Sequence, residues 1–427
     1  MPDRFPHGFS WGTATAAHQV EGNNHGNDWW DWEQHPGAIR SGERSDPACD
    51  HFQRFQEDFD LLRSLHQNAH RFSLEWSRIE PQDGVVDRAA IEHYRQVILA
   101  LRERGLEPFV TIHHFTIPRW LAGMGGWADP TSVERFARFV ELVVAELGEL
   151  VSYWITINEP TALVYQSYLA GEWPPGVRDF DAGARVLSHL LKAHWQAYER
   201  IKERHPRAQV GLAHHLRNFD PFRAWHPLDR LVALLYHRIF NETLLSSLRR
   251  GSAVYPLSRL GQASGPAPSQ DFIGLNYYTR NLLRFERRAR AELFGQRVNR
   301  ARAPVSDQGL EIYPHGLYRW LLALRRERLP VYITENGVAD ATDTLRPVFL
   351  LDHLRATLRA MGRGSPVRGY FHWTCFDNFE WAEGYGLKFG LASCDPSTQA
   401  RRLRSSGRLY AEICRTGVLP DPPAGGG

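Results

Sequence analysis

The sequence predicts an α/β fold, a single (β/α)8 barrel whose eight parallel strands close into a cylinder ringed by helices. Eight short apolar runs alternate with eight segments in which apolar residues recur at helical spacing. Within the runs, hydrophobicity is continuous rather than alternating, which is typical of parallel strands buried on both faces. The length of 427 residues and the 43% hydrophobic content suit one such barrel with insertions. The expected strands are residues 9–14, 69–74, 108–112, 153–157, 209–213, 272–275, 331–334 and 367–373.

The expected helices lie between and after these strands. In the first of them, Phe55, Phe59 and Leu62 fall on one helical face. No linker, low-complexity segment or charge block divides the chain, so we expect one barrel domain over residues 1–418. Residues 419–427 are rich in Pro and Gly and are expected to form a disordered tail. The expected helices are residues 50–65, 88–104, 132–147, 182–204, 228–249, 316–328, 349–361 and 405–415.

The charge and composition of the chain argue against several classes of binding partner. The net charge of +3 comes from interspersed positive and negative residues, which argues against a nucleic-acid or anionic-membrane partner. No run of 18 apolar residues is present, so we expect no membrane span. The N-terminal residues lack an apolar signal region, and the four cysteines have no metal or redox spacing. We therefore expect a cytoplasmic protein with reduced thiols; the oligomeric state is left open.

Two glutamates stand at the ends of expected strands. The run 151–157 is mostly apolar and is followed by Asn158, Glu159 and Pro160, where proline stops the strand pattern. A second apolar run, which begins at residue 331, ends in Glu335. In a (β/α)8 barrel the active site lies at the carboxyl ends of the strands, so we expect both carboxylates at one mouth. Paired carboxylates are the usual means of cleaving glycosidic bonds.

The other strand ends carry side chains suited to a sugar. Carboxylates and amides can pair with hydroxyl groups as acceptors and donors, imidazoles add further hydrogen bonds, and indoles cover the C–H face of a pyranose. We expect these groups to converge on the same mouth as the two glutamates. They include Gln19, Arg71, His114, Asn276, Tyr278, Trp373, Glu380 and Trp381.

At these residues the chain resembles glycoside hydrolase family 1, the retaining β-glycosidases. The resemblance covers residues 5–415 and consists of six motifs in the family's order, which makes a chance match very improbable. The motifs are Phe9-Ser10-Trp11-Gly12-Thr13-Ala14-Thr15 with Gln19, Glu21 and Gly22; Arg71-Phe72-Ser73 with Trp76-Ser77-Arg78-Ile79; Asn158-Glu159-Pro160; Asn276-Tyr277-Tyr278; Ile333-Thr334-Glu335-Asn336-Gly337; and Asp377-Asn378-Phe379-Glu380-Trp381.

The resemblance implies a retaining exo-β-glycosidase, similar to a β-glucosidase, that removes terminal β-D-glycosyl residues by double displacement. It implies that Glu159 is the acid/base and Glu335 the nucleophile, with Arg71 and Tyr278 supporting the nucleophile. A guanidinium and a phenol beside Glu335 would favour its charged form, and the charge of Glu335 would promote protonation of Glu159. The resemblance also suggests a cis peptide bond after Trp373. The implied substrate-binding residues are Gln19, His114, Asn158, Asn276, Tyr278, Trp373, Glu380 and Trp381.

Some positions depart from the family pattern. Phe115 and Thr116 stand where the family usually has Trp and Asp, which leaves the choice among glucose, galactose and fucose open. His18 and His70 replace the more usual tyrosines. The stretch 279–306 is rich in arginine, and we interpret it as a solvated basic loop in preference to an electropositive lip at the site.

Particular residues argue against the alternative functions. A 6-phospho-β-glycosidase of the same family is disfavoured because Glu380 and Glu383 would repel a phosphate. A non-catalytic sugar-binding barrel would be expected to have lost one of the two glutamates. The His113-His114 and His214-His215 pairs lack a third ligand at metal-binding spacing, so we expect no metal. We expect no cofactor; the expected partners are β-glucosides or related small β-glycosides.

Overall fold

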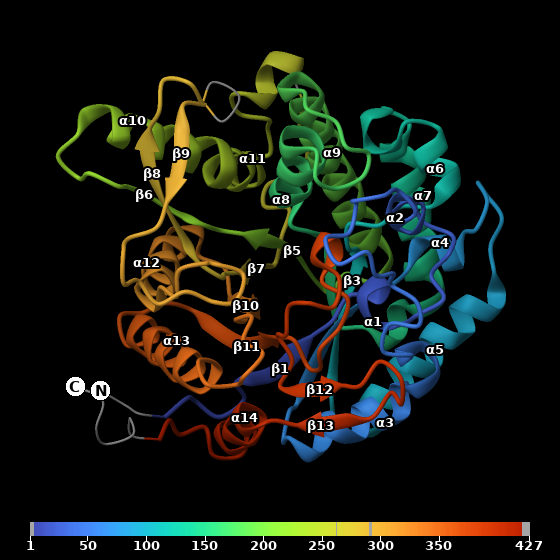
Figure 1. Ribbon diagram of the computed structural model, residues 1–427. Helices are drawn as coiled ribbons and strands as arrows, with labels where there is room; N and C mark the ends of the chain where they lie inside the picture. Colours follow the sequence, from blue (N-terminus) through green and yellow to red (C-terminus); the bar gives the residue numbers. More distant parts are fainter. Residues whose placement is uncertain (1–3, 262, 290–292, 421–427) are drawn as a thin grey trace.

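A computed structural model describes residues 4–261, 263–289 and 293–420. Eight parallel strands form a closed barrel in the order β1-β11-β10-β7-β5-β4-β3-β2, and Figure 1 shows helices arranged around it. Each expected strand is present, with bounds that differ by at most two residues. The barrel strands are β1 (Ser10–Ala14), β2 (Ala69–Ser73), β3 (Glu107–His113), β4 (Tyr153–Asn158), β5 (Gln209–His215), β7 (Phe272–Asn276), β10 (Val331–Asn336) and β11 (Val367–Trp373).

The eight expected helical segments are also found, but two of them are not continuous α-helices. The segment predicted over 316–328 is α12 (Pro314–Ala323) followed by a 3-10 turn, η6 (Leu324–Glu327). The segment predicted as one helix over 228–249 is α10 (Pro227–Tyr236), a π-helical segment η4 (His237–Glu242) and α11 (Thr243–Arg250). The π turn is a local irregularity of hydrogen bonding that side-chain periodicity does not reveal. The other long helices are α3 (His51–Ser64), α5 (Arg88–Glu103), α7 (Ser132–Leu147), α9 (Phe180–Arg204), α13 (Arg346–Met361) and α14 (Ser405–Thr416).

Short elements in the loops were not predicted. A three-stranded sheet joins β6 (Asn218–Pro221), β8 (Arg280–Phe285) and β9 (Gly295–Val298), and a hairpin joins β12 (Ala392–Cys394) to β13 (Arg401–Leu403). Figure 1 shows the three-stranded sheet beside α10 and the hairpin at a different edge of the molecule. The other short helical elements are α1 (Ala17–Val20), α2 (Asp28–Glu33), α4 (Trp76–Ile79), α6 (Arg119–Gly123), α8 (Pro160–Val164), η1 (Gly126–Ala128), η2 (Gly148–Leu150), η3 (Tyr165–Ala170), η5 (Leu257–Leu260) and η7 (Trp381–Glu383).

Aromatic rings pack together where several barrel strands begin. Phe109 of β3 stacks on Tyr153 of β4 with ring centroids 4.2 Å apart, and it also meets Phe371 and Tyr332 at 4.8 and 5.2 Å. Gly12 makes room for this cluster, because a Cβ there would come within 2.6 Å of the Phe371 ring. The packed rings fill this part of the barrel, so the polar groups at the opposite ends of the strands face the mouth.

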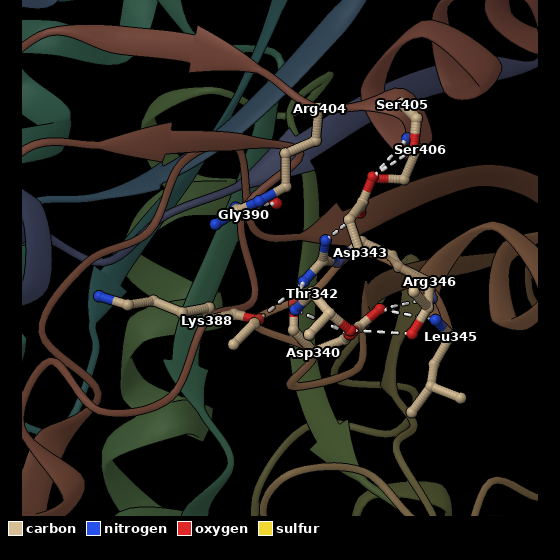
Figure 2. Close-up of polar contacts among 12 residues, drawn as sticks. Asp340, Thr342, Asp343, Leu345, Arg346, Lys388, Gly390, Arg404, Ser405 and Ser406 are labelled. Atoms are coloured by element: carbon tan, nitrogen blue, oxygen red, sulfur yellow. Dashed lines mark hydrogen bonds and ion pairs between the residues drawn. The ribbon is translucent and has the colours of Figure 1, made fainter.

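A polar cluster ties the loop after β10 to α13, α14 and the segment after β11 (Figure 2). Arg346 is 0% exposed; it forms an ion pair with Asp343 and donates to the carbonyl oxygens of Asp340 and Lys388 at 2.6 and 2.7 Å. The Asp343 carboxylate also accepts from the backbone N–H of Ser406 at 2.9 Å. The cluster therefore holds together the loops that follow β10 and β11.

Two further features concern the helices and the C-terminal end of the chain. Within the described residues, no helix has the length and apolar character needed to cross a membrane. Of the tail expected over 419–427, residues 421–427 lie outside the described part of the chain. Leu419 lies inside it, and this side chain is buried in the hydrophobic core, so packing continues past residue 418.

Candidate active site

Glu159 stands at the junction of β4 and α8. Its backbone N–H continues the barrel ladder by donating to the carbonyl oxygen of Ala213 at 2.8 Å, and Pro160 then opens the helix. The backbone of Glu159 is left-handed, with φ of 45°, which is unusual for a residue other than glycine and is kept where surrounding contacts define it. The side chain is 5% exposed. The turn thus places a buried carboxylate at the barrel mouth.

Glu335 lies within β10, where the pairing with β7 and β11 is irregular. Its Oε1 accepts a hydrogen bond from Nη1 of Arg71 at 2.6 Å, and its Oε2 accepts one from the hydroxyl of Tyr278 at 2.6 Å. Arg71 belongs to β2 and is held from behind, because its Nε donates to Oγ1 of Thr111 at 3.1 Å. Glu335 is therefore a buried carboxylate with a cationic donor in direct contact.

A chain of amides connects the two glutamates. Nη2 of Arg71 donates to Oδ1 of Asn158 at 2.6 Å, and Nδ2 of Asn276 donates to the same oxygen at 3.0 Å. Nδ2 of Asn276 also donates to Oε1 of Glu159 at 2.7 Å, and Thr334 fixes the amide by donating to Oδ1 at 2.7 Å. These contacts leave little freedom for either carboxylate, because each amide is oriented by partners on both of its ends.

His215, at the end of β5, contacts the other oxygen of Glu159. Its Nδ1 lies 2.7 Å from Oε2 of Glu159, and Nε of Arg217 donates to its Nε2 at 2.8 Å. A guanidinium has no acceptor, so Nε2 of His215 must be unprotonated and Nδ1 must carry the proton. Burial also lowers the pKa of His215. His215 is thus a neutral donor to Glu159.

The two carboxyl groups titrate as a pair. Burial raises the pKa of Glu335 to about 7 against the opposing charge of Arg71, and the charge of Glu159 adds to the rise. Burial acts to raise the pKa of Glu159, but His215, Asn276 and Arg217 together lower it below its usual value. The largest lowering requires a charged His215, and the donor from Arg217 leaves that imidazole neutral. Among the described residues, the only cation in direct contact with either carboxylate is Arg71 on Glu335, which favours the anion there and leaves the shared proton on Glu159.

Both carboxylates line a pocket of about 340 Å³. His114 lies in its wall; Nε2 accepts from Nδ2 of Asn158 at 3.1 Å, so the proton is on Nδ1, which is buried and has no partner among the described residues. Trp373 and Trp381 add apolar surface to the same pocket. The pocket combines an unused donor with indole faces, a combination suited to a hydroxylated ring.

Glu380 is a partly buried acid in the same pocket. Burial raises its pKa to about 8, and the charge of Glu335 adds to the rise. Nε2 of Gln19 donates to Oε2 of Glu380 at 3.2 Å and to the carbonyl oxygen of Phe379 at 2.8 Å. Oε1 of Gln19 is buried with no partner among the described residues. This end of the pocket therefore has both acceptor and donor capacity to spare.

Comparison with known proteins assigns the family. Residues 1–418 match the model of Glycosyl hydrolase family 1. The chain belongs to glycosyl hydrolase family 1. It is 34% identical to the Beta-glucosidase A of Thermotoga maritima, over 98% of this chain and 99% of that protein.

Solved structures of similar proteins agree with that assignment. The beta-glycosidase from Pyrococcus horikoshii superposes with a TM-score of 0.89 at 36% identity, covering 99% of this chain and 97% of that one. The Beta-glucosidase from Thermotoga maritima in complex with glucoimidazole has a TM-score of 0.91 at 32% identity, covering 98% of this chain and all of that one. The barrel predicted from the sequence is the fold of this family.

The structure of this family 1 glycosidase brings the predicted site residues together. Glu159, Glu335, His114, Asn158, Tyr278, Trp373, Glu380 and Trp381 all line the one pocket. Arg71, Asn276 and Gln19 lie directly behind it and contact its carboxylates. The peptide bond between Trp373 and Thr374 is cis, as the resemblance suggested.

The structure also locates the residues that depart from the family pattern. Phe115 lines the pocket and packs against Trp173 and Trp381 with ring centroids 4.8 and 5.2 Å apart. His18 stacks on Trp381 at 5.8 Å and lies outside the pocket lining, with its Nε2 2.8 Å from Oε1 of Glu33. His70 is a buried imidazole whose pKa is lowered to about 3 by burial. The predicted departures from the family pattern thus alter the pocket wall mainly through Phe115.

The arginines of residues 279–306 were expected to form a solvated basic loop in preference to an electropositive lip at the site. Arg287, Arg288, Arg300 and Arg302 are exposed, as a solvated basic loop requires. Arg297, on β9, is exposed as well, but it also lines the pocket. The prediction of a solvated basic loop therefore fits these arginines, and the alternative of a cationic lip at the mouth fits Arg297, because pairing of β8 with β9 brings this residue to the pocket.

Sequence reasoning also missed Arg217. This residue lines the pocket and contacts His215. The signal was available, because Arg217 follows the expected fifth strand and such loops carry site residues. Tyr165, in η3 after Glu159, was missed as a pocket residue as well.

Proposed function

We propose that this family 1 enzyme is a retaining exo-β-glycosidase that removes terminal glucosyl residues from β-glucosides. The observation that carries the proposal is the unequal environment of two buried carboxylates in one pocket. Glu335 has a cationic donor in Arg71, whereas Glu159 has the neutral donors His215 and Asn276. One carboxylate is thereby suited to be an anion and the other to hold a proton.

In this mechanism the carboxylate of Glu335 attacks the anomeric carbon while Glu159 protonates the departing glycosidic oxygen. The resulting ester removes the negative charge of Glu335, so Glu159, now ionised, can take a proton from water. The water then attacks the anomeric carbon and releases the sugar with its original configuration. His215 and Asn276 stay in contact with Glu159 and would hold the carboxyl group in place between the two steps.

The glycone would lie between Trp373 and the polar end of the pocket. Gln19 and Glu380 can pair with hydroxyl groups there, and the free Nδ1–H of His114 can donate to another. Asn158 would contact the hydroxyl next to the anomeric carbon. Glucose agrees with the names of the Thermotoga relatives, and the acid Glu380 disfavours a phosphorylated glycone. The four cysteines are free, which accords with a proposed cytoplasmic location.

The stereochemistry of azide rescue tests the two roles separately. In Glu335→Ala, azide can occupy the vacated volume and attack an activated aryl β-glucoside once, which should give the α-glucosyl azide. In Glu159→Ala the covalent intermediate still forms from a good leaving group, and azide should attack it to give the β-glucosyl azide. Each product is identified by its anomeric proton coupling in NMR spectra.

Glu172→Ala provides a matched control, because this glutamate lines the mouth but contacts neither catalytic carboxylate. It should show no azide dependence. Exchange of the two anomers would reverse the assigned roles. Absence of rescue in both variants, with native circular dichroism spectra, would contradict the double-displacement mechanism. A parallel screen of aryl β-glucoside, β-galactoside, β-fucoside and 6-phospho-β-glucoside would test the proposed glycone.

A further inference from the structure

One wall of the pocket carries two arginines that form no direct ion pair with the described residues. Arg217 and Arg297 both line the pocket, and the guanidinium of Arg297 lies 5.0 Å from the ring centroid of Tyr165. Among the described residues neither guanidinium forms an ion pair. Arg40, on another part of the lining, is instead neutralised by Glu383 at 2.9 Å. The wall formed by Arg217, Arg297 and Tyr165 is called the cationic wall below.

The backbone holds the cationic wall in place before any ligand binds. Arg217 donates its N–H to Oδ1 of Asn241 at 3.1 Å and accepts from Nδ2 of the same residue at 2.9 Å. Arg297 is paired with Leu283 in the β8–β9 ladder. Nε of Arg217 is occupied by His215, and its terminal nitrogens have no hydrogen-bond partner among the described residues. Donors are thus positioned at the pocket without an acceptor.

The position of this wall follows from its link to Glu159. In the mechanism proposed above, Glu159 gives its proton to the oxygen of the leaving group. Only the imidazole of His215 separates Arg217 from that carboxyl group. Gln19 and Glu380, which would bind the glycone, belong to the other end of the pocket and contact each other. The cationic wall therefore borders the space that the aglycone would occupy.

We propose that the cationic wall selects β-glucosides whose aglycone carries a carboxylate group. The inference rests on the proposed glycosidase function and adds the chemical class of the leaving group. Guanidinium groups match the geometry of a carboxylate and can bind both of its oxygens. None of the described pocket acids bonds either guanidinium directly: Glu383 is paired with Arg40, and Glu159 acts on Arg217 only through its charge, across His215.

The electrostatic repulsion between Arg217 and Arg297 supports the proposal. Burial lowers the pKa of Arg217 to about 10, and the neighbouring charge of Arg297 contributes. Two like charges that repel each other in a partly enclosed site are stabilised when an anion binds between them. A neutral aglycone would leave both uncompensated. The wall should therefore discriminate between aglycones of the same shape by charge.

The test compares 4-carboxyphenyl β-D-glucoside with 4-carbamoylphenyl β-D-glucoside, which have similar shapes and differ in charge. The measured quantity is the ratio of kcat/KM for the carboxylate over the amide. We expect Arg297→Gln and Arg217→Gln each to lower this ratio about fivefold to tenfold relative to wild type. Arg300→Gln, an exposed position in the chain segment just after β9, is the control and should leave the ratio unchanged. Raising the salt concentration should lower the wild-type ratio.

The ratio of kcat/KM values for the two substrates separates effects on aglycone recognition from effects on the catalytic steps. Arg217→Gln also disturbs the donor of Glu159, but that effect acts on both substrates. An equal ratio in wild type and both variants would overturn the proposal while leaving the glycosidase function intact. Failure of the wild type to hydrolyse these substrates and 4-nitrophenyl β-D-glucoside would refute the proposed function itself. In that case, calorimetric binding of 4-hydroxybenzoate against 4-hydroxybenzamide still decides the cationic wall, since equal affinities would reject it.

Discussion

Two arginines, Arg71 and Arg346, are each 0% exposed and each pair with a carboxylate, but their surroundings differ. Arg346 is enclosed by protein groups: two backbone carbonyls accept from it, and its partner Asp343 accepts from residues of α14 (Figure 2). Arg71 reaches a carboxylate that borders an open pocket together with four further glutamates. The Arg346 cluster does not reach the pocket, although Nε of Arg346 has no hydrogen-bond partner among the described residues, whereas the Arg71 cluster borders the pocket and has groups left for a ligand.

The contrast shows how to recognise a functional site among buried charges. In the Arg346 cluster the carboxyl pKa values of Asp340 and Asp343 are lowered against the effect of burial, by hydrogen bonds to backbone and side-chain donors. In the Arg71 cluster burial raises the carboxyl pKa values of Glu335 and Glu380 to about 7 and about 8. Carboxyl groups whose negative charge is only partly balanced by nearby cations and donors reduce the stability of the fold. Such groups indicate a site where catalysis can occur.

The largest expected effect separates activity from stability at Arg71. Arg71→Met should lower kcat/KM on an aryl β-glucoside about 10³-fold, because Glu335 loses its cationic donor. The free energy of unfolding should fall by only about 1 kcal/mol, because Glu335 can take up a proton near neutral pH. Steady-state kinetics and urea unfolding measure the two quantities. Arg63→Met, on the exposed face of α3, is the control; an active Arg71→Met enzyme would remove Arg71 from the machinery.

Arg346→Met should show the reverse pattern. It should lower the free energy of unfolding by about 3 kcal/mol, since Asp343 loses its cation and two buried carbonyl groups lose a donor. The kcat/KM of the protein that remains folded should stay within about twofold of wild type, because Arg346 does not line the pocket. Arg363→Met, at an exposed position after α13, is the matched control. A variant as stable as wild type would show that the Arg346 cluster contributes little.

Glu380→Ser should have a smaller effect on catalysis. It removes a charged or strongly hydrogen-bonding group from the glycone end and should weaken transition-state binding by about 1.5–3 kcal/mol, measured as kcat/KM on an aryl glucoside. Because burial raises the pKa of Glu380 to about 8, loss of this acid should also stabilise the fold slightly at high pH. Unchanged kcat/KM would exclude Glu380 from the glycone site.

The smallest effect concerns the pH dependence of stability, which should have opposite signs in the two clusters. Glu335 and Glu380 have raised pKa values, so their contribution is present below their usual pKa and is lost as pH rises toward 7 and 8. We expect Glu335→Gln/Glu380→Gln to reduce the loss of unfolding free energy between pH 5 and pH 8 by at least about 1.4 kcal/mol, the equivalent of one pKa unit. Asp340 and Asp343 have lowered pKa values, so their contribution is present above their usual pKa and is lost on acidification. Chemical unfolding across pH would contradict this if the double variant kept the wild-type slope.

The sequence by itself determined the barrel and the convergence of the polar strand ends. Continuous apolar runs can be buried only in a sheet covered on both faces, and parallel closure brings their carboxyl ends together. That reasoning was enough to name Glu159 and Glu335, because each directly follows or ends such a run. Turns and motifs near the strands also identified Arg71, Asn276 and Glu380, whose neighbours in sequence mark them.

Only the tertiary structure decided how these groups share protons and which further residues join them. The neutral state of His215 depends on Arg217, and the position of Arg297 depends on a hairpin that pairs with the loop after β5. The pairing of β6 with β8 joins positions 62 apart, such as 218 and 280, and leaves no local period in the sequence. Sequence pattern specifies which strand carries a residue. Hydrogen-bond direction and the charge balance of a pocket require coordinates, because both depend on distances between chain segments that no local pattern encodes.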